Sequence, residues 1–199
     1  MRFLFFILIS SFLLLFSNLG LAGNYRAQSP LIKNNIKEYP ILKTKRGTID
    51  EKAGIFRYRY NLHETGYSGS AEEIARAYLK DHFKEYGLDA LTNTLQTVRV
   101  RQTPGGYHVF FDQVINNIPV YDGRMVITLN PQKAVTFVAS NYRPTIGVRH
   151  IKAQISAEQA ITIARDYLQV TGKLLGQQKA SLVWFESQDR GQELCWRVS

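Results

Sequence analysis

Cysteine is almost absent from this chain. The 199 residues include one cysteine, Cys195, so no disulfide can form within the chain. This excludes the small secreted scaffolds that depend on several disulfides for their stability. Cys195 lies in an alternating apolar stretch without a catalytic signature, and we expect a buried small side chain there.

Motifs that would identify an enzyme are also lacking. The sequence contains no His-Glu-x-x-His motif, no glycine-rich phosphate loop and no Gly-x-Ser-x-Gly elbow. His63-Glu64 supplies only the first half of the zinc motif, in a turn-like context where a helix is not expected. The other histidines, His82, His108 and His150, show no ligand spacing. We therefore expect no catalytic residue, metal site or cofactor in this chain.

Acidic residues are fewer than basic ones. There are 16 Asp and Glu against 25 Lys and Arg, which gives a formal net charge of +9. This charge favours attraction to acidic surfaces without naming a partner. Arg and Tyr alternate over 57–60, as they also do on some nucleic-acid-binding surfaces. A strand of period two explains the alternation, and we expect no nucleic-acid partner.

Long apolar runs are absent except at the N-terminus. Arg2 precedes an apolar run over 3–16, and Gly20 and Ala22 place small residues where a signal peptidase reads. We predict a signal peptide over 1–22, cleaved between Ala22 and Gly23, and a secreted or periplasmic/extracellular protein without a stable membrane anchor. An uncleaved anchor is the alternative, although the run is short for a bilayer.

The next stretch, residues 23–52, is polar and contains Pro30 and Pro40. This composition predicts a loose leader with little core of its own. Lys43–Arg46 within it is a basic cluster, either a solvated loop or a processing site for a trypsin-like protease. The compact part of the chain is expected to begin at residue 53.

From residue 53 the pattern changes to strands and one helix. Residues 55–62 alternate between Tyr, Phe or Leu and Arg or Asn, which predicts an amphipathic strand. Ser70–Glu73 is a capping box, and it opens a helix with one apolar stripe that ends at Gly87. A further strand over 95–101 is expected to turn Val98 and Val100 inward and its two arginines outward.

The centre of the chain, residues 106–142, predicts a meander of strands. Residues 107–115 alternate and place Phe111 and Gln113 on one face. Asn116-Asn117 can take the positive φ angles of a hairpin. Asp122-Gly123 and Asn130-Pro131 predict two more turns. Three turns at this spacing give an antiparallel sheet, and the helix is expected to lie across it.

This centre resembles the FTP domain of the pro-regions of fungalysin- and thermolysin-like zinc metallopeptidases. The resemblance is carried by Phe111 and Gln113, then by Asn117, then by the run Pro119-Val120-Tyr121. The family commonly has Gly where this chain has Asn117, and Asn also tolerates the left-handed conformation. The resemblance implies a cystatin-like α+β fold, in which a helix packs on an antiparallel sheet over residues 53–143.

The same motif residues are candidates for contact with a partner, together with Tyr107. Tyr107 and Phe111 share an apolar face, however, and a core position is the alternative interpretation. Gln113 is the unusual residue on that face, because a buried polar group must find a hydrogen-bond partner. We expect that partner to be backbone groups near the Asn116-Asn117 turn, which would make the role of Gln113 structural.

A second small α+β unit is predicted over residues 144–199. Ser156–Gln159 repeats the capping box and opens a helix with an apolar stripe (Ala160, Ile163, Ala164, Tyr167, Leu168) that Gly172 ends. Two strands follow. The unit resembles a PepSY domain through residues 155–168 and 193–198, and PepSY domains often follow FTP domains in these pro-regions. The two helix starts are similar, either as a weak internal repeat or as two solutions to the same capping problem.

The two resemblances imply a pro-region of a secreted thermolysin/fungalysin-like zinc metallopeptidase. Such a pro-region inhibits its catalytic domain and assists its folding, in cis or in trans. Zinc is expected only in that catalytic domain, which this chain lacks, and the PepSY-like unit is expected to be incomplete at its C-terminus. A free-standing secreted protease inhibitor and a structural envelope module are the alternatives.

Overall fold

The computed structural model describes residues 5–8, 41–43, 46–88, 94–144, 152–172, 176–187 and 191–199. These residues form mixed α+β structure, so the predicted fold class is confirmed. The chain divides into two compact units, which we call the central unit (residues 38–149) and the terminal unit (residues 1–37 together with 150–199). Within the described residues, no helix is long and apolar enough to cross a membrane.

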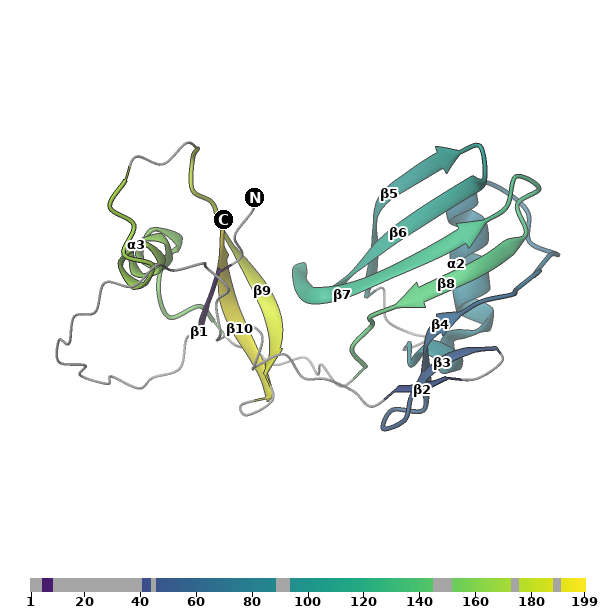
Figure 1. Ribbon diagram of the computed structural model, residues 1–199, viewed down its shortest axis with the longest axis horizontal. Helices are drawn as coiled ribbons and strands as arrows, with labels where there is room; N and C mark the ends of the chain where they lie inside the picture. The colour runs from purple at the N-terminus through teal and green to yellow at the C-terminus, as the bar shows by residue number, and fades with distance from the viewer. Residues whose placement is uncertain are drawn as a thin grey trace. The chain divides into compact units, whose positions relative to one another are not determined.

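The central unit is built on an antiparallel sheet with the strand order β5-β6-β7-β8-β4-β3-β2 (Figure 1). The hairpin between β6 and β7 has the predicted positive φ angles, 52° at Asn116 and 63° at Asn117. The elements are β2 (Ile41–Lys43), β3 (Gly47–Asp50), β4 (Ile55–Arg59), α2 (Ala71–Asp81), η1 (Phe83–Tyr86), β5 (Leu95–Thr103), β6 (Gly106–Ile115), β7 (Ile118–Leu129) and β8 (Val135–Ser140).

Helix α2 starts at the predicted capping box. Ser70 Oγ accepts a hydrogen bond from the Glu73 N–H (3.2 Å), and Glu73 Oε2 accepts one from the Ser70 N–H (2.7 Å). The α-helix ends at His82, and the 3₁₀ turn η1 carries the chain to Gly87, whose φ of 66° is left-handed. The helical segment therefore spans the predicted range but changes its type near residue 83.

The core of the central unit lies between α2 and one face of the sheet. Ile74, Tyr78 and Leu79 of α2 are buried against strand residues that include Phe111 and Ile127. The predicted alternation of β6 is confirmed, because its odd-numbered residues from 109 to 115 are buried and its even-numbered ones are not. The apolar residues recur about every 3.6 residues on the helix and every second residue on the strands, and the two sets together form one continuous buried layer.

The sheet begins earlier in the chain than the sequence suggested. β2 and β3 lie within residues 23–52, which we expected to be a loose leader, and the central unit starts at residue 38 rather than 53. Asp50 of β3 is completely buried. Its carboxylate accepts hydrogen bonds from the backbone N–H groups of Lys52 and Ala53, both 3.0 Å. The polar composition did not predict this strand, because a charged residue such as Asp50 can be buried only when other parts of the chain supply its hydrogen-bond partners.

Strand β4 buries the side that carries its arginines. Arg57 and Arg59 are 6% and 9% exposed, whereas Tyr58 between them is 42% exposed. Arg57 Nη2 donates to Asp50 Oδ2 at 2.7 Å, and Arg59 pairs with Glu85 of η1. The alternation predicted for 55–62 is present, but ion pairs from other elements decide which face is inside.

Asp122-Gly123 is not the turn that we expected. β7 runs through it without interruption, and the pairing register with β6 shifts at this point, which makes it a bulge. Asp122 has a φ of 56°, and a Cβ on Gly123 would lie 2.9 Å from Val120 Cβ and 3.0 Å from Gln113 Oε1. The same residue types serve turns and bulges, since both need positive φ or close backbone approach.

Strand β5 lies at the edge of the sheet, and its valines are not inside. Val98 and Val100 are 53% and 44% exposed, so neither is buried as expected, although Val100 pairs opposite the buried Val109 and lies on the predicted side of the sheet. The register with β6 shifts between Thr97 and Arg99, which leaves Val98 as an extra residue in the ladder. An edge strand also has a neighbouring strand on one side only, so its side chains are less covered. Alternation in the sequence cannot show that a strand lies at the edge of a sheet.

The terminal unit contains a helix and a small antiparallel sheet. β1 pairs with β10, and β10 pairs with β9. β1 falls within the segment predicted as a signal peptide, while the predicted cleavage site at Ala22 and Gly23 lies outside the described residues, so the signal peptide stays a prediction. The elements are β1 (Phe5–Leu8), α3 (Ala157–Tyr167), β9 (Ala180–Ser187) and β10 (Gly191–Val198).

Helix α3 also begins with the predicted capping box. Ser156 Oγ accepts from the Gln159 N–H (3.2 Å), and Gln159 Oε1 accepts from the Ser156 N–H (2.8 Å). The helix ends before Gln169, whose φ of 51° is left-handed. Gly172, the predicted stop, is not at the helix end. A non-glycine residue thus takes the position at which we expected glycine.

The apolar stripe predicted for α3 is buried only in part. Ala160 and Ala164 are buried and pack against Val198 of β10. Ile163 and Tyr167 are 44% and 59% exposed, and Leu168 after the helix is 38% exposed. The helix therefore contacts its sheet through Ala160, Ala164 and the partly buried Ile161, while Ile163 and Tyr167 remain exposed.

Candidate protein-binding face

One face of the central sheet is covered by α2, and no described helix of the central unit lies on the other. Strand register places the uncovered side chains in rows, one of which runs through Arg99, Phe110, Val126, Ala139 and Tyr58 from β5 to β4. In Figure 1 α2 lies behind the sheet, so this face is turned toward the viewer. We call it the outer face. Its large aromatic and basic side chains are Tyr58, Phe110, Phe137, Arg99, Arg101 and Arg124.

The aromatic side chains of the outer face pack on one another and on a guanidinium. The rings of Tyr58 and Phe137 are stacked, with centroids 6.4 Å apart and planes 26° apart. The guanidinium carbon of Arg99 lies 4.4 Å from the centroid of the Phe110 ring, within range of a cation–π contact. These contacts fix the orientation of large side chains on an open surface, which lowers the entropy they would lose on binding a partner.

The charges of the outer face are partly compensated. Arg124 donates from Nε to Asp112 Oδ1 at 2.7 Å and from Nη2 to Oδ2 at 3.1 Å, a bidentate pair between β7 and β6. The hydrogen bonds to Asp112 raise the pKa of Arg124. Among the described residues, neither Arg99 nor Arg101 has a carboxylate within 4.0 Å. Beside its aromatic patch the face therefore carries two arginines that no described carboxylate pairs with.

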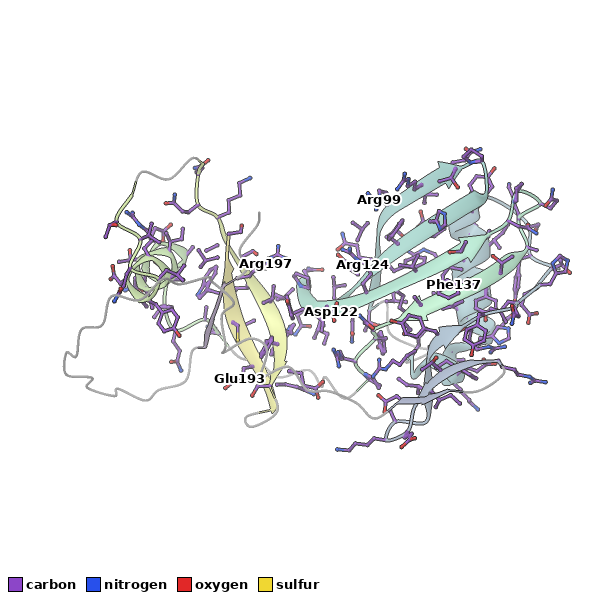
Figure 2. The ribbon with its side chains drawn as sticks, viewed as in Figure 1. Arg99, Asp122, Arg124, Phe137, Glu193 and Arg197 are labelled. Atoms are coloured by element: carbon purple, nitrogen blue, oxygen red, sulfur yellow. The ribbon has the colours of Figure 1, made fainter. Side chains whose placement is uncertain are left out.

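Figure 2 shows Arg99, Arg124 and Phe137 on three different strands of the sheet. Their side chains include no nucleophile and no acid–base pair, and the described residues contain no group of three or more His, Cys, Asp or Glu that could hold a metal ion. Aromatic residues and arginine are the types enriched in protein interfaces and at their energetic hot spots. The chemistry that this face offers is recognition of another protein surface.

Two of the motif residues predicted as site candidates lie on the opposite side of the sheet. Phe111 is completely buried under α2, with the guanidinium carbon of Arg76 5.1 Å from its ring centroid. Gln113 is 1% exposed. Tyr107 is partly buried and packs against the same core. These three side chains contribute to the fold and are not presented to a partner in this structure.

Gln113 holds a connection that sequence reasoning did not find. Its Nε2 donates to the backbone O of Arg143 (3.1 Å), and its Oε1 accepts from the Arg143 N–H (2.9 Å). The predicted partner near the Asn116-Asn117 turn is wrong, because the side-chain amide pairs like a backbone amide with the chain that leaves β8. A buried amide with both groups satisfied fixes the path of that segment.

The remaining motif residues lie in the hairpin and along β7. Asn117 takes its positive φ in the turn, and Pro119 pairs opposite Val114 of β6. Val120 is buried, whereas Tyr121 is partly buried next to the bulge. Asn117 thus shapes the hairpin, and Val120 packs closely at the bulge together with Gln113.

The residues rejected as catalytic candidates have other positions. Glu64 forms an isolated bridge with Val135, so the segment after His63 is extended rather than helical. His82 caps the end of α2, stacks on Tyr78 (4.4 Å between centroids) and contacts Glu85 through Nδ1 at 2.8 Å. Cys195 is completely buried, as predicted. His150 lies outside the described residues.

The sequence did not reveal the outer face, because the strongest apolar signal of β6 lies on its odd-numbered residues. Its even-numbered residues His108, Phe110 and Asp112 carry the signal: a Phe between polar side chains on the expected solvent side of a strand. The outward arginines of β5 pointed to the same face. The strand register places Arg99 opposite Phe110, and the alternation of residues within one strand cannot predict that register.

Comparison with known proteins agrees with the resemblance seen in the centre of the chain. Residues 93–142 match the family described as Fungalysin/Thermolysin Propeptide Motif, which confirms the FTP resemblance for this segment. The solved structure titled Bacillus megaterium YpeB C-terminal domain is similar over 80% of this chain and 76% of that chain, with 15% sequence identity and a TM-score of 0.39. Among curated proteins, none matches this chain. The PepSY resemblance of residues 144–199 stays a prediction.

Proposed function

We propose that this chain is the pro-region of a secreted thermolysin/fungalysin-like zinc metallopeptidase. In that role it binds the catalytic domain, inhibits it until processing, and assists its folding. The observation that carries the proposal is the match of residues 93–142 to the propeptide motif of these peptidases. Zinc belongs to the catalytic domain, and no residue of this chain is assigned to it.

The physical basis is the binding of one folded surface to another. A pro-region with its own core, such as the layer between α2 and the sheet, can hold a complementary surface ready before the catalytic domain has folded. Binding to the native-like state of a slowly folding domain stabilises that state by mass action. The same complex blocks substrate access when the covered surface includes the cleft.

The test is inhibition of a peptidase by the purified chain. Increasing amounts of the chain are added to one thermolysin-like and one fungalysin-like catalytic domain, and hydrolysis of a small peptide substrate is followed. We expect saturable inhibition of at least one of them, with no effect on a serine peptidase assayed under the same conditions. A second assay measures whether the chain raises the yield of active enzyme on refolding.

The alternatives make different predictions in the same assays. A free-standing secreted inhibitor acts in trans but leaves the refolding yield unchanged. A structural envelope module neither inhibits the enzymes nor binds them in calorimetry. Absence of inhibition and of binding with both metallopeptidases would remove the pro-region proposal and favour the structural module.

A further inference from the structure

We propose that the outer face of the central unit is the surface that docks on the catalytic domain, and that it recognises an acidic surface patch with an apolar centre. This inference rests on the proposed function and adds to it the side of the molecule that makes the contact. It also adds the chemistry of the surface that is contacted.

The outer face is accessible to a partner, whereas two of the FTP motif residues are not. The FTP motif residues Phe111 and Gln113 are buried between α2 and the sheet, so they cannot contact a partner while the unit is folded. The face of α2 that points away from the sheet carries charged side chains, such as those of Glu73 and Lys80. Within the central unit, the outer face keeps large aromatic side chains accessible: Tyr58 is 42% exposed, and Phe110 and Phe137 are partly exposed.

Two arginines of the outer face are already held in position. The Arg99 guanidinium rests 4.4 Å from the Phe110 ring centroid, and the bidentate bond to Asp112 holds Arg124 in place. A planar guanidinium stacked on an aromatic ring still presents its N–H groups at its edge, where carboxylates bind. Groups already held in position lose less conformational entropy when a partner arrives.

The outer face carries positive charge that can attract an acidic partner. Asp112 compensates Arg124, whereas Arg99 and Arg101 have no carboxylate within 4.0 Å among the described residues. The whole chain carries a formal net charge of +9, which adds attraction at longer range. Two arginines beside an apolar patch complement a partner that has carboxylates beside an apolar patch.

The experiment compares four forms of the full chain in the inhibition assay. They are the wild type, the charge reversal Arg99→Glu/Arg101→Glu, the aromatic truncation Phe137→Ala, and the control Lys80→Glu. Lys80 is exposed on α2, on the other side of the sheet, and its reversal tests whether net charge alone is responsible. Circular dichroism and hydrogen exchange of β6 establish that each variant is folded.

We expect the double reversal to raise the inhibition constant by at least about tenfold at low salt. The salt dependence of inhibition should become weaker, because the screened attraction has been removed. We expect a smaller increase for Phe137→Ala and a change of less than about twofold for Lys80→Glu. Because Arg99 and Arg101 are exposed, their reversal tests the proposal even where the aromatic variant fails to fold.

Each other outcome has a distinct meaning. If the wild type inhibits and the folded double reversal inhibits equally well, the outer face is not the docking surface, and the proposed function stands. If the wild type does not inhibit, the proposed function fails instead. Binding of the wild type to anionic phosphatidylserine vesicles, lost in the double reversal while inhibition is unchanged, would assign the face to a membrane surface and overturn the proposal.

Discussion

The two helices of this protein begin in the same way and are used differently. α2 and α3 each span 11 residues and start with a complete capping box at a serine. α2 buries the large side chains of Ile74, Tyr78 and Leu79, all at or below 4% exposure. α3 buries only Ala160 and Ala164 and leaves Ile163 and Tyr167 exposed.

The difference shows that a capping box fixes where a helix starts and says nothing about how much of it is buried. Capping depends on four consecutive residues and is complete before any partner is in place. Burial depends on the surface that arrives from elsewhere in the chain. For α2 that surface is the broad sheet formed by β6, β7 and β8, and for α3 it is a small sheet whose buried contact with the helix is Val198 of β10.

Removing the same side chain from each helix tests this comparison most strongly. Ile74 is 1% exposed and Ile163 is 44% exposed. We expect Ile74→Ala to lower the free energy of unfolding of the central unit by about 2–5 kcal/mol, because it leaves a cavity. Ile163→Ala is expected to change the terminal unit by less than about 0.5 kcal/mol.

The two units can be followed separately in this experiment. Both tryptophans of the chain, Trp184 and Trp196, belong to the terminal unit, so their fluorescence reports its unfolding. Hydrogen exchange of β6 amides reports the central unit. Equal losses for Ile74→Ala and Ile163→Ala would mean that α3 is packed as tightly as α2 and would invalidate the comparison.

Local features of the fold could be predicted from the sequence. Both capping boxes depend on spacing within four residues, and the hairpin at Asn116-Asn117 depends on two residues that tolerate positive φ. The buried side of β6 followed from alternation of strongly apolar residues. Each of these predictions needed no knowledge of what another part of the chain contributes.

Errors arose where a distant residue decides the outcome. Arg57 is inside because Asp50 supplies a buried carboxylate, and no alternation within β4 contains that information. Gln113 bonds to the backbone of Arg143, 30 positions later in the chain. The outer face was missed for the same reason, since it exists only once register brings Arg99 opposite Phe110. The sequence shows the residue types of this face, but it does not show that they come together on one side of the sheet.

The caps should behave alike even though the helices do not. Ser70→Ala and Ser156→Ala each remove a side-chain acceptor from the first turn, and we expect each to cost about 1 kcal/mol in its own unit. Denaturant unfolding followed by tryptophan fluorescence measures the terminal unit, and hydrogen exchange measures the central one. A cost for Ser156→Ala several times that for Ser70→Ala would show that α3 depends on its cap to replace missing burial.

The smallest expected difference lies in the third helical residue, which is Glu73 in α2 and Gln159 in α3. The hydrogen bond from the Ser70 N–H, followed by that from its hydroxyl, lowers the pKa of Glu73 below its usual 4.5. A carboxylate whose pKa is depressed by folding stabilises the fold above its unfolded pKa, and this stabilisation is lost as the pH falls through the folded pKa. Gln159 does not titrate, so its bond to the Ser156 N–H persists in acid.

We therefore expect the amide proton shift of Ser70 to titrate with a midpoint below 4.5 in an NMR pH series. The shift of Ser156 is compared in a Glu158→Gln background, because the pKa of Glu158 is also lowered by hydrogen bonds at the start of α3. There it should show no such midpoint. Glu73→Gln gives α2 the same neutral box as α3, so the Ser70 midpoint should disappear while the bond is kept. A Ser70 titration that survives Glu73→Gln would mean that another acid, such as Glu72, controls the first turn of α2, and the two caps would then differ in more than this one charge.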